Sequence, residues 1–186
     1  MKTNTLGLLI FTLIVTSSFS VTSKKMNSIF NFTKASNLNG WRVVNDDVMG
    51  GVSSASFGLN EEGNAEFKGS VSTANNGGFA SVRYRFKKKD ITGKTTIAIR
   101  LKGDSKSYQF RLKSKSNTYY SYTTTFSTSN SWETIKIELK DLYPSFRGRK
   151  LNEVNFNEAS IEEIAFLIGN KKNESFKLII DKIEIE

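Results

Sequence analysis

The segment whose residue types are best suited to carry chemistry is residues 45–54, NDDVMGGVSS, which places two adjacent carboxylates beside a glycine pair. Gly50 and Gly51 can adopt positive φ at little cost, so the pattern predicts a sharp turn in which Asp46 and Asp47 accept hydrogen bonds from loop N–H groups. The alternative is that both carboxylates line a cleft or hold a hard cation such as Ca²⁺. The alternating ligand spacing of a calcium loop is missing, and no Lys-Ser/Thr follows the glycines as in a phosphate loop, so the pattern favours the turn.

Three further segments combine charge with glycine or aromatic residues. Gly103 and Asp104, in KGDSKSY, predict the bend of a hairpin. The segment FRGR, residues 146–149, has two guanidinium groups that could clamp a carboxylate or phosphate, or form a solubilising surface loop. Residues 102–122 interleave basic residues with four tyrosines. This mixture is typical of a stacking platform for bases or sugars, but we favour two amphipathic strands with the tyrosines inward.

The residue types that are missing exclude several chemistries. The 186 residues contain no His and no Cys, which excludes a Ser-His-Asp triad, a thiol nucleophile, disulfides and an ordinary zinc site. Only carboxylates, Lys, Tyr and Ser remain as possible catalysts, and the interpretation developed below predicts no metal, no cofactor and no catalytic residues. The net charge of +9, from 27 Lys and Arg against 18 Asp and Glu, favours anionic partners such as lipid headgroups, acidic glycans or an acidic protein face. Nucleic acid ranks last, because we expect the protein to be exported.

The expectation of export comes from residues 1–23, where one Lys precedes an apolar run from Leu6 to Val15 and then small residues. This is the layout of a secretory signal, and the run is shorter than the roughly 20 residues of a membrane-spanning helix. An uncleaved anchor is the alternative. We expect cleavage near Ser20, a periplasmic or extracellular location, a flexible lead over 21–27, one domain over 28–186 and no transmembrane span in the mature chain. Loss of Lys2 with the signal would leave a charge of +8.

The elements that must position these groups are strands. Apolar and polar residues alternate over 55–59, 80–86, 95–101, 108–112, 120–126, 135–139 and 176–185, with Gly- and Asn-rich breaks between them. Many short strands predict an all-β fold, an antiparallel β-sandwich of jelly-roll type. Ser160 and Glu163, in SIEE, match a capping box and predict one helical turn before a buried strand over 164–168.

The strand over 79–86 has two different faces. Ala80, Val82, Tyr84 and Phe86 are predicted to face the core, and Phe79, Ser81, Arg83 and Arg85 to face outward. Arg83 would then be either an ordinary solvated charge or a cleft residue paired with Asp46 or Asp47.

Several segments occur in one order that resembles a known family: WRVVNDDVMGGVSSASF, AEFKGSVS, NNGGFASVR, LKGDSKSYQFRL, SWETIKIEL, YPSFRGRKL and IEEIAFLIGN…ESFKLIIDKIE. They resemble the complex I intermediate-associated protein 30 family over about Phe30 to Glu186. The resemblance implies a galactose-binding-like β-sandwich with no known catalytic residues. Mitochondrial members help to assemble respiratory complex I, and plastid relatives carry the domain in photosystem assembly factors.

The motifs of this family and the chemistry above give one set of candidate residues for binding a partner or ligand: Asp46, Asp47, Met49, Gly50, Gly51, Ser53, Gly77, Gly78, Phe79, Arg83, Asp104, Tyr108, Arg111, Phe146, Arg147 and Gly148. We expect the DDVMGG and FRGR segments to face the same end of the sandwich, where the arginines would compensate the paired carboxylates.

The resulting interpretation is a non-enzymatic binding or assembly factor whose partner is a protein, in a membrane-associated complex. The alternative is a carbohydrate-binding module with a glycan ligand. A hydrolase using Asp46 or Asp47 with Asp104 as second carboxylate is the third choice, because glycosidase chemistry needs two carboxylates at a set separation.

Overall fold

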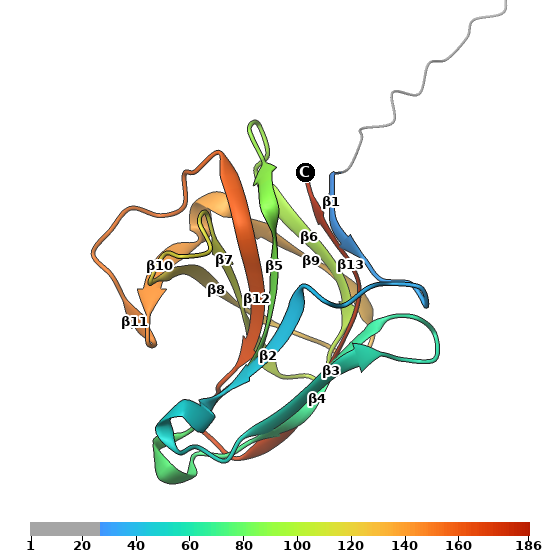
Figure 1. Ribbon diagram of the computed structural model, residues 1–186, viewed down its shortest axis with the longest axis vertical. Coiled ribbons are helices and arrows are strands. Elements are labelled where there is room, and N and C mark those ends of the chain that lie inside the picture. Colours follow the sequence, from blue (N-terminus) through green and yellow to red (C-terminus); the bar gives the residue numbers. More distant parts are fainter. Residues whose placement is uncertain (1–26) are drawn as a thin grey trace, which may run out of the picture.

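Alternating side chains produce strands along the whole described chain, as the sequence predicts. The computed structural model describes residues 27–186, which form two antiparallel sheets packed face to face (Figure 1). The fold is therefore the expected all-β sandwich of jelly-roll type. The strands are β1 (Asn27–Asn31), β2 (Trp41–Asn45), β3 (Ser54–Leu59), β4 (Ala65–Val71), β5 (Ala80–Asp90), β6 (Thr96–Lys102), β7 (Ser107–Lys113), β8 (Ser121–Ser127), β9 (Trp132–Glu138), β10 (Tyr143–Phe146), β11 (Arg149–Lys150), β12 (Ser160–Ile168) and β13 (Glu174–Ile185). Short 3₁₀ segments are η1 (Asp46–Met49), η2 (Ala74–Asn76) and η3 (Leu139–Asp141).

The strands are shared between a six-stranded and a seven-stranded sheet. The six-stranded sheet has the order β3-β4-β13-β6-β9, with β1 paired to the second half of β13. The seven-stranded sheet has the order β11-β10-β8-β7-β12-β5-β2. Figure 1 shows it curving from β2 near the centre, through β12, to β10 and β11 at the left. The expected signal peptide over 1–20, and all but the last residue of the expected lead over 21–27, lie outside the described residues.

The core lies between the sheets and follows the predicted alternation. Trp41 is stacked between Phe57 and Tyr84, with ring centroids 4.7 Å from it on each side. Ala80 and Val82 are fully buried, and Tyr84 packs against the core, so the face of β5 expected to point inward does so. Arg83 and Arg85 therefore lie on the outer face of the seven-stranded sheet.

Two local predictions are wrong. The SIEE segment is not helical, because Ser160–Ile168 forms β12, which pairs with β5 on one side and β7 on the other. Backbone hydrogen bonds to two neighbours and four fully buried side chains, those of Ile161, Ile164, Phe166 and Ile168, outweigh the local capping signal. The KGDSKSY segment is not a hairpin either, since β6 and β7 belong to different sheets and the segment crosses between them.

Candidate functional site

The DDVMGG segment is a tight turn that leaves β2 and enters β3. Asp46–Met49 form η1, and Gly50 closes it in the left-handed conformation with φ of 83°. The Gly50 N–H donates to the Asp47 carbonyl at 2.9 Å, and the Gly51 N–H donates to the Asp46 carbonyl at 3.2 Å. The predicted turn is thus present, with positive φ at Gly50. Met49 lies within η1 as part of the same turn.

The Asp46 carboxylate is the centre of this region. Its side chain is 2% exposed, and it accepts four hydrogen bonds. One oxygen accepts from the Ser53 N–H at 3.1 Å. The other accepts from the Ser53 hydroxyl at 2.6 Å, the Gly78 N–H at 2.6 Å and the Phe79 N–H at 3.2 Å. We call this group, Asp46 with Ser53, Gly78 and Phe79, the aspartate cradle.

The electrostatics of the cradle match its geometry. Burial by itself raises the pKa of the Asp46 carboxyl, but the hydrogen bonds from Ser53, Gly78 and Phe79 outweigh it and hold the pKa below the usual value. Asp46 is therefore ionised in the folded protein at neutral pH, and all its donors come from the chain itself. Among the described residues, no group of three or more Asp, Glu, His or Cys side chains is placed to hold a metal ion.

Two glycines are required by the close approach of the chain to this carboxylate. A Cβ at Gly51 would overlap the Asp46 side chain, and a Cβ at Gly77 would lie 2.6 Å from its Oδ2 atom. Gly50 is different, because a Cβ there would meet nothing within 4 Å and only its positive φ favours glycine. Asp47, the other member of the acidic pair, is exposed.

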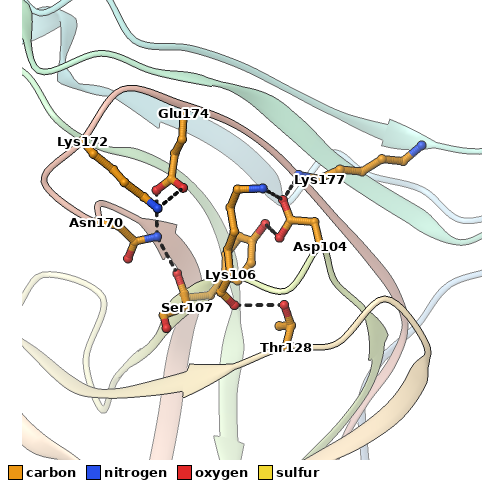
Figure 2. A network of polar contacts seen from close by, with 9 residues as sticks. Asp104, Lys106, Ser107, Thr128, Asn170, Lys172, Glu174 and Lys177 are labelled. Atoms are coloured by element: carbon orange, nitrogen blue, oxygen red, sulfur yellow. Dashed lines mark hydrogen bonds and ion pairs between the residues drawn. The ribbon is translucent and has the colours of Figure 1, made fainter.

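Asp104 and Tyr108 belong to a second polar network, which Figure 2 shows from close by. Asp104 accepts hydrogen bonds from the Tyr108 hydroxyl at 2.9 Å, the Lys106 ammonium at 2.8 Å and the Lys177 N–H at 2.9 Å. Burial, and then the nearby Asp104 carboxylate, raise the pKa of the Tyr108 hydroxyl well above its usual value. Tyr108 is therefore a neutral donor held in the core.

The FRGR segment is a tight hairpin between β10 and β11. Phe146 pairs with Arg149, and the two turn residues Arg147 and Gly148 both have positive φ, 48° and 76°. This is the geometry of a type I′ turn, in which an Arg at the first position is strained. The Arg147 guanidinium lies 5.3 Å from the centroid of the Phe146 ring, which is 39% exposed.

The strand register separates this hairpin from the aspartate cradle. β2 and β11 form opposite edges of the seven-stranded sheet. The pairing can be followed from β2 through β5, β12 and β7 to β8. Along this path Asn45 of β2 aligns with Phe126 at one end of β8, whereas Ser145 of β10 pairs with Ser121 at the other end. The expectation that DDVMGG and FRGR face the same end is therefore wrong. The arginines of the hairpin do not compensate Asp46, because backbone N–H groups and a serine hydroxyl do.

Arg83 and Arg111 meet on the outer face of the seven-stranded sheet. The pairing of successive strands aligns one residue from each of six strands, a set that we call the arginine row: Arg42, Arg83, Ala165, Arg111, Thr123 and Tyr143. The core residues next to them in sequence point inward, so the row points outward. Of the two alternatives for Arg83, pairing with Asp46 does not occur, since Asp46 accepts its hydrogen bonds from Ser53, Gly78 and Phe79.

The candidate residues thus fall into four places rather than one site. Six belong to or border the aspartate cradle, two to the Asp104 network, two to the arginine row and three to the β10–β11 hairpin, with Asp47, Met49 and Gly50 in the turn beside the cradle. Sequence reasoning missed Arg42, Thr123 and Tyr143. No local signal could have found them, because only the strand pairing places them beside Arg83 and Arg111.

The two-sheet architecture is that of a jelly-roll β-sandwich of the galactose-binding-like type. The chain belongs to the complex I intermediate-associated protein 30 family, whose model matches residues 30–180. No curated protein matches the sequence.

Solved structures share the fold at low identity. The chain is similar to a family 11 carbohydrate-binding module from Clostridium thermocellum in complex with a β-1,3-1,4-mixed-linked tetrasaccharide, with 16% identity, coverage of 86% of this chain and 94% of that one, and a TM-score of 0.63. The family 11 module of the C. thermocellum cellulase Lic26A-Cel5E gives 15% identity, 86% and 93% coverage and a TM-score of 0.61. An agarase, AgWH50C, gives 13% identity and a TM-score of 0.59, and 87% of this chain matches 24% of the agarase.

The first prediction concerns the charge on Asp46. Asp46→Asn places an amide NH₂ against N–H donors and removes charge-assisted hydrogen bonds, so we expect the free energy of unfolding at pH 7 to fall by about 2–3 kcal/mol. Urea denaturation measures it. The matched control is Asp141→Asn, an exposed aspartate, for which we expect a change within about 0.5 kcal/mol.

The same pair of proteins gives a pH test. Because the folded pKa of Asp46 is lowered, its contribution is present above the unfolded pKa of about 3.9 and is lost as the pH falls through the folded value. The stability difference between wild type and Asp46→Asn should therefore shrink below about pH 4. A difference that is unchanged, or that grows on acidification, would contradict the cradle.

The second prediction separates the two adjacent glycines. Gly50→Ala should cost about 1 kcal/mol through its left-handed backbone, and Gly50→Asn should recover most of that loss. Gly51→Ala and Gly51→Asn should both cost about 1–3 kcal/mol, because any side chain at position 51 would overlap the Asp46 side chain. Thermal unfolding of the four variants decides the matter, with Gly58→Ala as control, since its Cβ would meet nothing within 4 Å. Equal recovery by Asn at both positions would refute the distinction.

Proposed function

We propose that this protein is a non-catalytic binding factor that assists the assembly or stability of a membrane-associated protein complex. The observation that carries the proposal is the match of the complex I intermediate-associated protein 30 family to residues 30–180, which is almost the whole described domain. The family description names association with a complex I intermediate. The described chain contains no helix with the length and apolarity needed to cross a bilayer.

The chemistry of the acidic residues supports a binding role over a catalytic one. A hydrolase would need an acid or nucleophile with a lone pair or proton available to the substrate. Asp46 is buried, ionised and bound by four donors of its own chain, and Asp104 accepts three hydrogen bonds. Both carboxylates hold the structure together, so neither is available for the reaction that the sequence left open.

The proposed location is outside the cytoplasm, with the first 20 residues removed. The support is the secretory layout of residues 1–23. An exported domain with an excess of basic residues would meet an acidic partner face at the membrane surface.

The third prediction tests this function in the native host. A C-terminally tagged chain, crosslinked in living cells with a lysine-reactive reagent, should repeatedly recover the subunits of one membrane complex from the cell envelope. N-terminal sequencing of the recovered chain should begin near Val21. The control is a tagged, exported jelly-roll carbohydrate-binding module of similar size, which should not recover the same subunits.

Two results would replace the proposal. Recovery of no shared complex across repeats, together with a glycan-array signal that free sugar competes away, would make the protein a carbohydrate-binding module. Recovery of the chain from the soluble cytoplasmic fraction with Met1 intact would contradict the proposal that the protein is exported.

A further inference from the structure

The outer face of the seven-stranded sheet carries positive charge that the described chain does not neutralise. Arg42 and Arg83 are cross-strand neighbours on β2 and β5. Arg83 and Arg111 lie on the two strands that flank β12, each opposite Ala165. Because neighbouring strands are about 4.8 Å apart, the Arg83 and Arg111 backbones are separated by about 10 Å across the small side chain of Ala165. Three guanidinium groups thus border a shallow strip of sheet.

The charges on this face are unequally compensated. Arg85 forms an ion pair with Glu163, with 2.6 Å between Nε and the carboxylate. No acidic side chain within residues 27–186 forms an ion pair with Arg42, Arg83 or Arg111. Arg111 is instead oriented by two hydrogen bonds to the Gln109 amide oxygen, at 3.1 and 2.7 Å. Burial, and then the positive charge of Arg83, lower the pKa of Arg111. A nearby carboxylate would have the opposite effect and raise this pKa.

The floor beneath the row also has unused hydrogen-bonding capacity. Ala165 is 4% exposed and Thr123 is 1% exposed although both belong to the outward-facing row. The Thr123 hydroxyl is buried and, among the described residues, has no hydrogen-bond partner. A buried polar group without a partner costs free energy in the free protein. A hollow of about 90 Å³ opens at the β2 end of the row, lined by Gly40, Arg42, Val44, Arg83 and Arg85.

We propose that the arginine row is the partner-binding surface of this protein and that it binds an acidic polypeptide segment, with partner carboxylates held by Arg42, Arg83 and Arg111. This inference rests on the proposed function for the protein nature of the partner. Guanidinium groups bind carboxylates through paired, parallel hydrogen bonds, which gives both attraction and orientation. Gln109 holds Arg111 in advance, so less side-chain freedom is lost on binding.

The composition of the row favours a peptide over a sugar or a nucleic acid. Sugars and bases are held by stacking on exposed aromatic rings as well as by charge. Tyr143 is the single aromatic residue of the row, and the Lys150 ammonium lies 5.1 Å from the centroid of its ring. Of the exposed aromatic side chains, Trp132 lies on β9 of the other sheet, and Tyr119 contacts Phe146 at the β10–β11 hairpin. Charge, rather than stacking, is therefore what this face offers.

The fourth prediction uses the purified chain and a fluorescein-labelled decamer of glutamate, followed by fluorescence anisotropy. The decamer should bind, the matching glutamine decamer should not, and the affinity should fall as salt is raised. Arg83→Gln with Arg111→Gln should weaken binding by at least about tenfold, which is the loss of one or two charge-assisted contacts. Lys34→Gln with Lys140→Gln removes the same charge elsewhere on the surface and should change the affinity by less than about twofold. Both double variants should keep the wild-type melting temperature within a few degrees.

The conservative variant distinguishes the geometry of the row from its charge. Arg83→Lys with Arg111→Lys keeps both charges but loses the planar fork, so we expect most of the affinity to be lost here too. Full affinity in the lysine variant, or equal losses in the two glutamine pairs, would overturn the proposal, since binding would then follow net charge. Tighter, row-dependent binding of polygalacturonate of matched charge would also overturn it, in favour of an acidic glycan.

Failure of this inference is distinguishable from failure of the proposed function. If crosslinking recovers a membrane complex equally well with wild type and with Arg83→Gln plus Arg111→Gln, the function stands and the row is not the surface. If the glutamate decamer binds through the row but no complex is recovered from cells, the surface stands and the assembly role fails.

Discussion

The burial of one ionised carboxylate is the constraint on which this fold depends. Asp46 follows β2 of the seven-stranded sheet, while Ser53 leads into β3 of the six-stranded sheet and Gly78 and Phe79 lead back into β5. The chain crosses between the sheets twice in this region, and the Asp46 side chain binds both crossings at once. A buried charge is costly unless its donors are complete. The cradle therefore fixes the path of both loops, and the glycines at 51 and 77 are the space it needs.

The Asp104 network holds three other loops that connect the two sheets. Asp104 lies between β6 and β7 and accepts from Lys106 and from Lys177 of β13, while the Thr128 hydroxyl, after β8, donates to the Lys106 carbonyl (Figure 2). Asn170, between β12 and β13, donates to the Ser107 carbonyl. The Thr73 N–H also donates to the Asn173 side chain at 2.7 Å, which links the β4–β5 loop to the β12–β13 loop. Loops that connect the sheets at this end are thus held by side-chain acceptors, where strand pairing cannot reach.

The sequence predicts the parts of this structure that have a local signal. Alternation identifies the core face of β5 from Ala80 to Phe86, and the glycine pair identifies the turn after Asp46. It cannot show where a carboxylate finds its donors, because Ser53 and Gly78 are 7 and 32 residues from Asp46. The SIEE segment shows the opposite failure, in which a good local signal is overruled by pairing on both sides of β12. The arginine row depends wholly on register, since its members come from six strands and have nothing in common along the chain.

The residues of the family motifs and the arginines of the row differ in what they contribute to the protein. The acidic and glycine residues that carry the family resemblance hold loops together, so their loss would damage the fold before it changed any binding. The arginines of the row are the opposite case, because they contribute to the proposed binding and not to the stability of the fold. Arg42 and Arg83 repel each other across the strand pair, and Arg111 is partly desolvated, so replacing one of them relieves repulsion in the free protein. A residue set that is unfavourable for the isolated domain is best explained by a ligand that compensates it. The buried carboxylates therefore hold the loops at one end of the sandwich, whereas the proposed recognition of an acidic partner takes place on the outer sheet face.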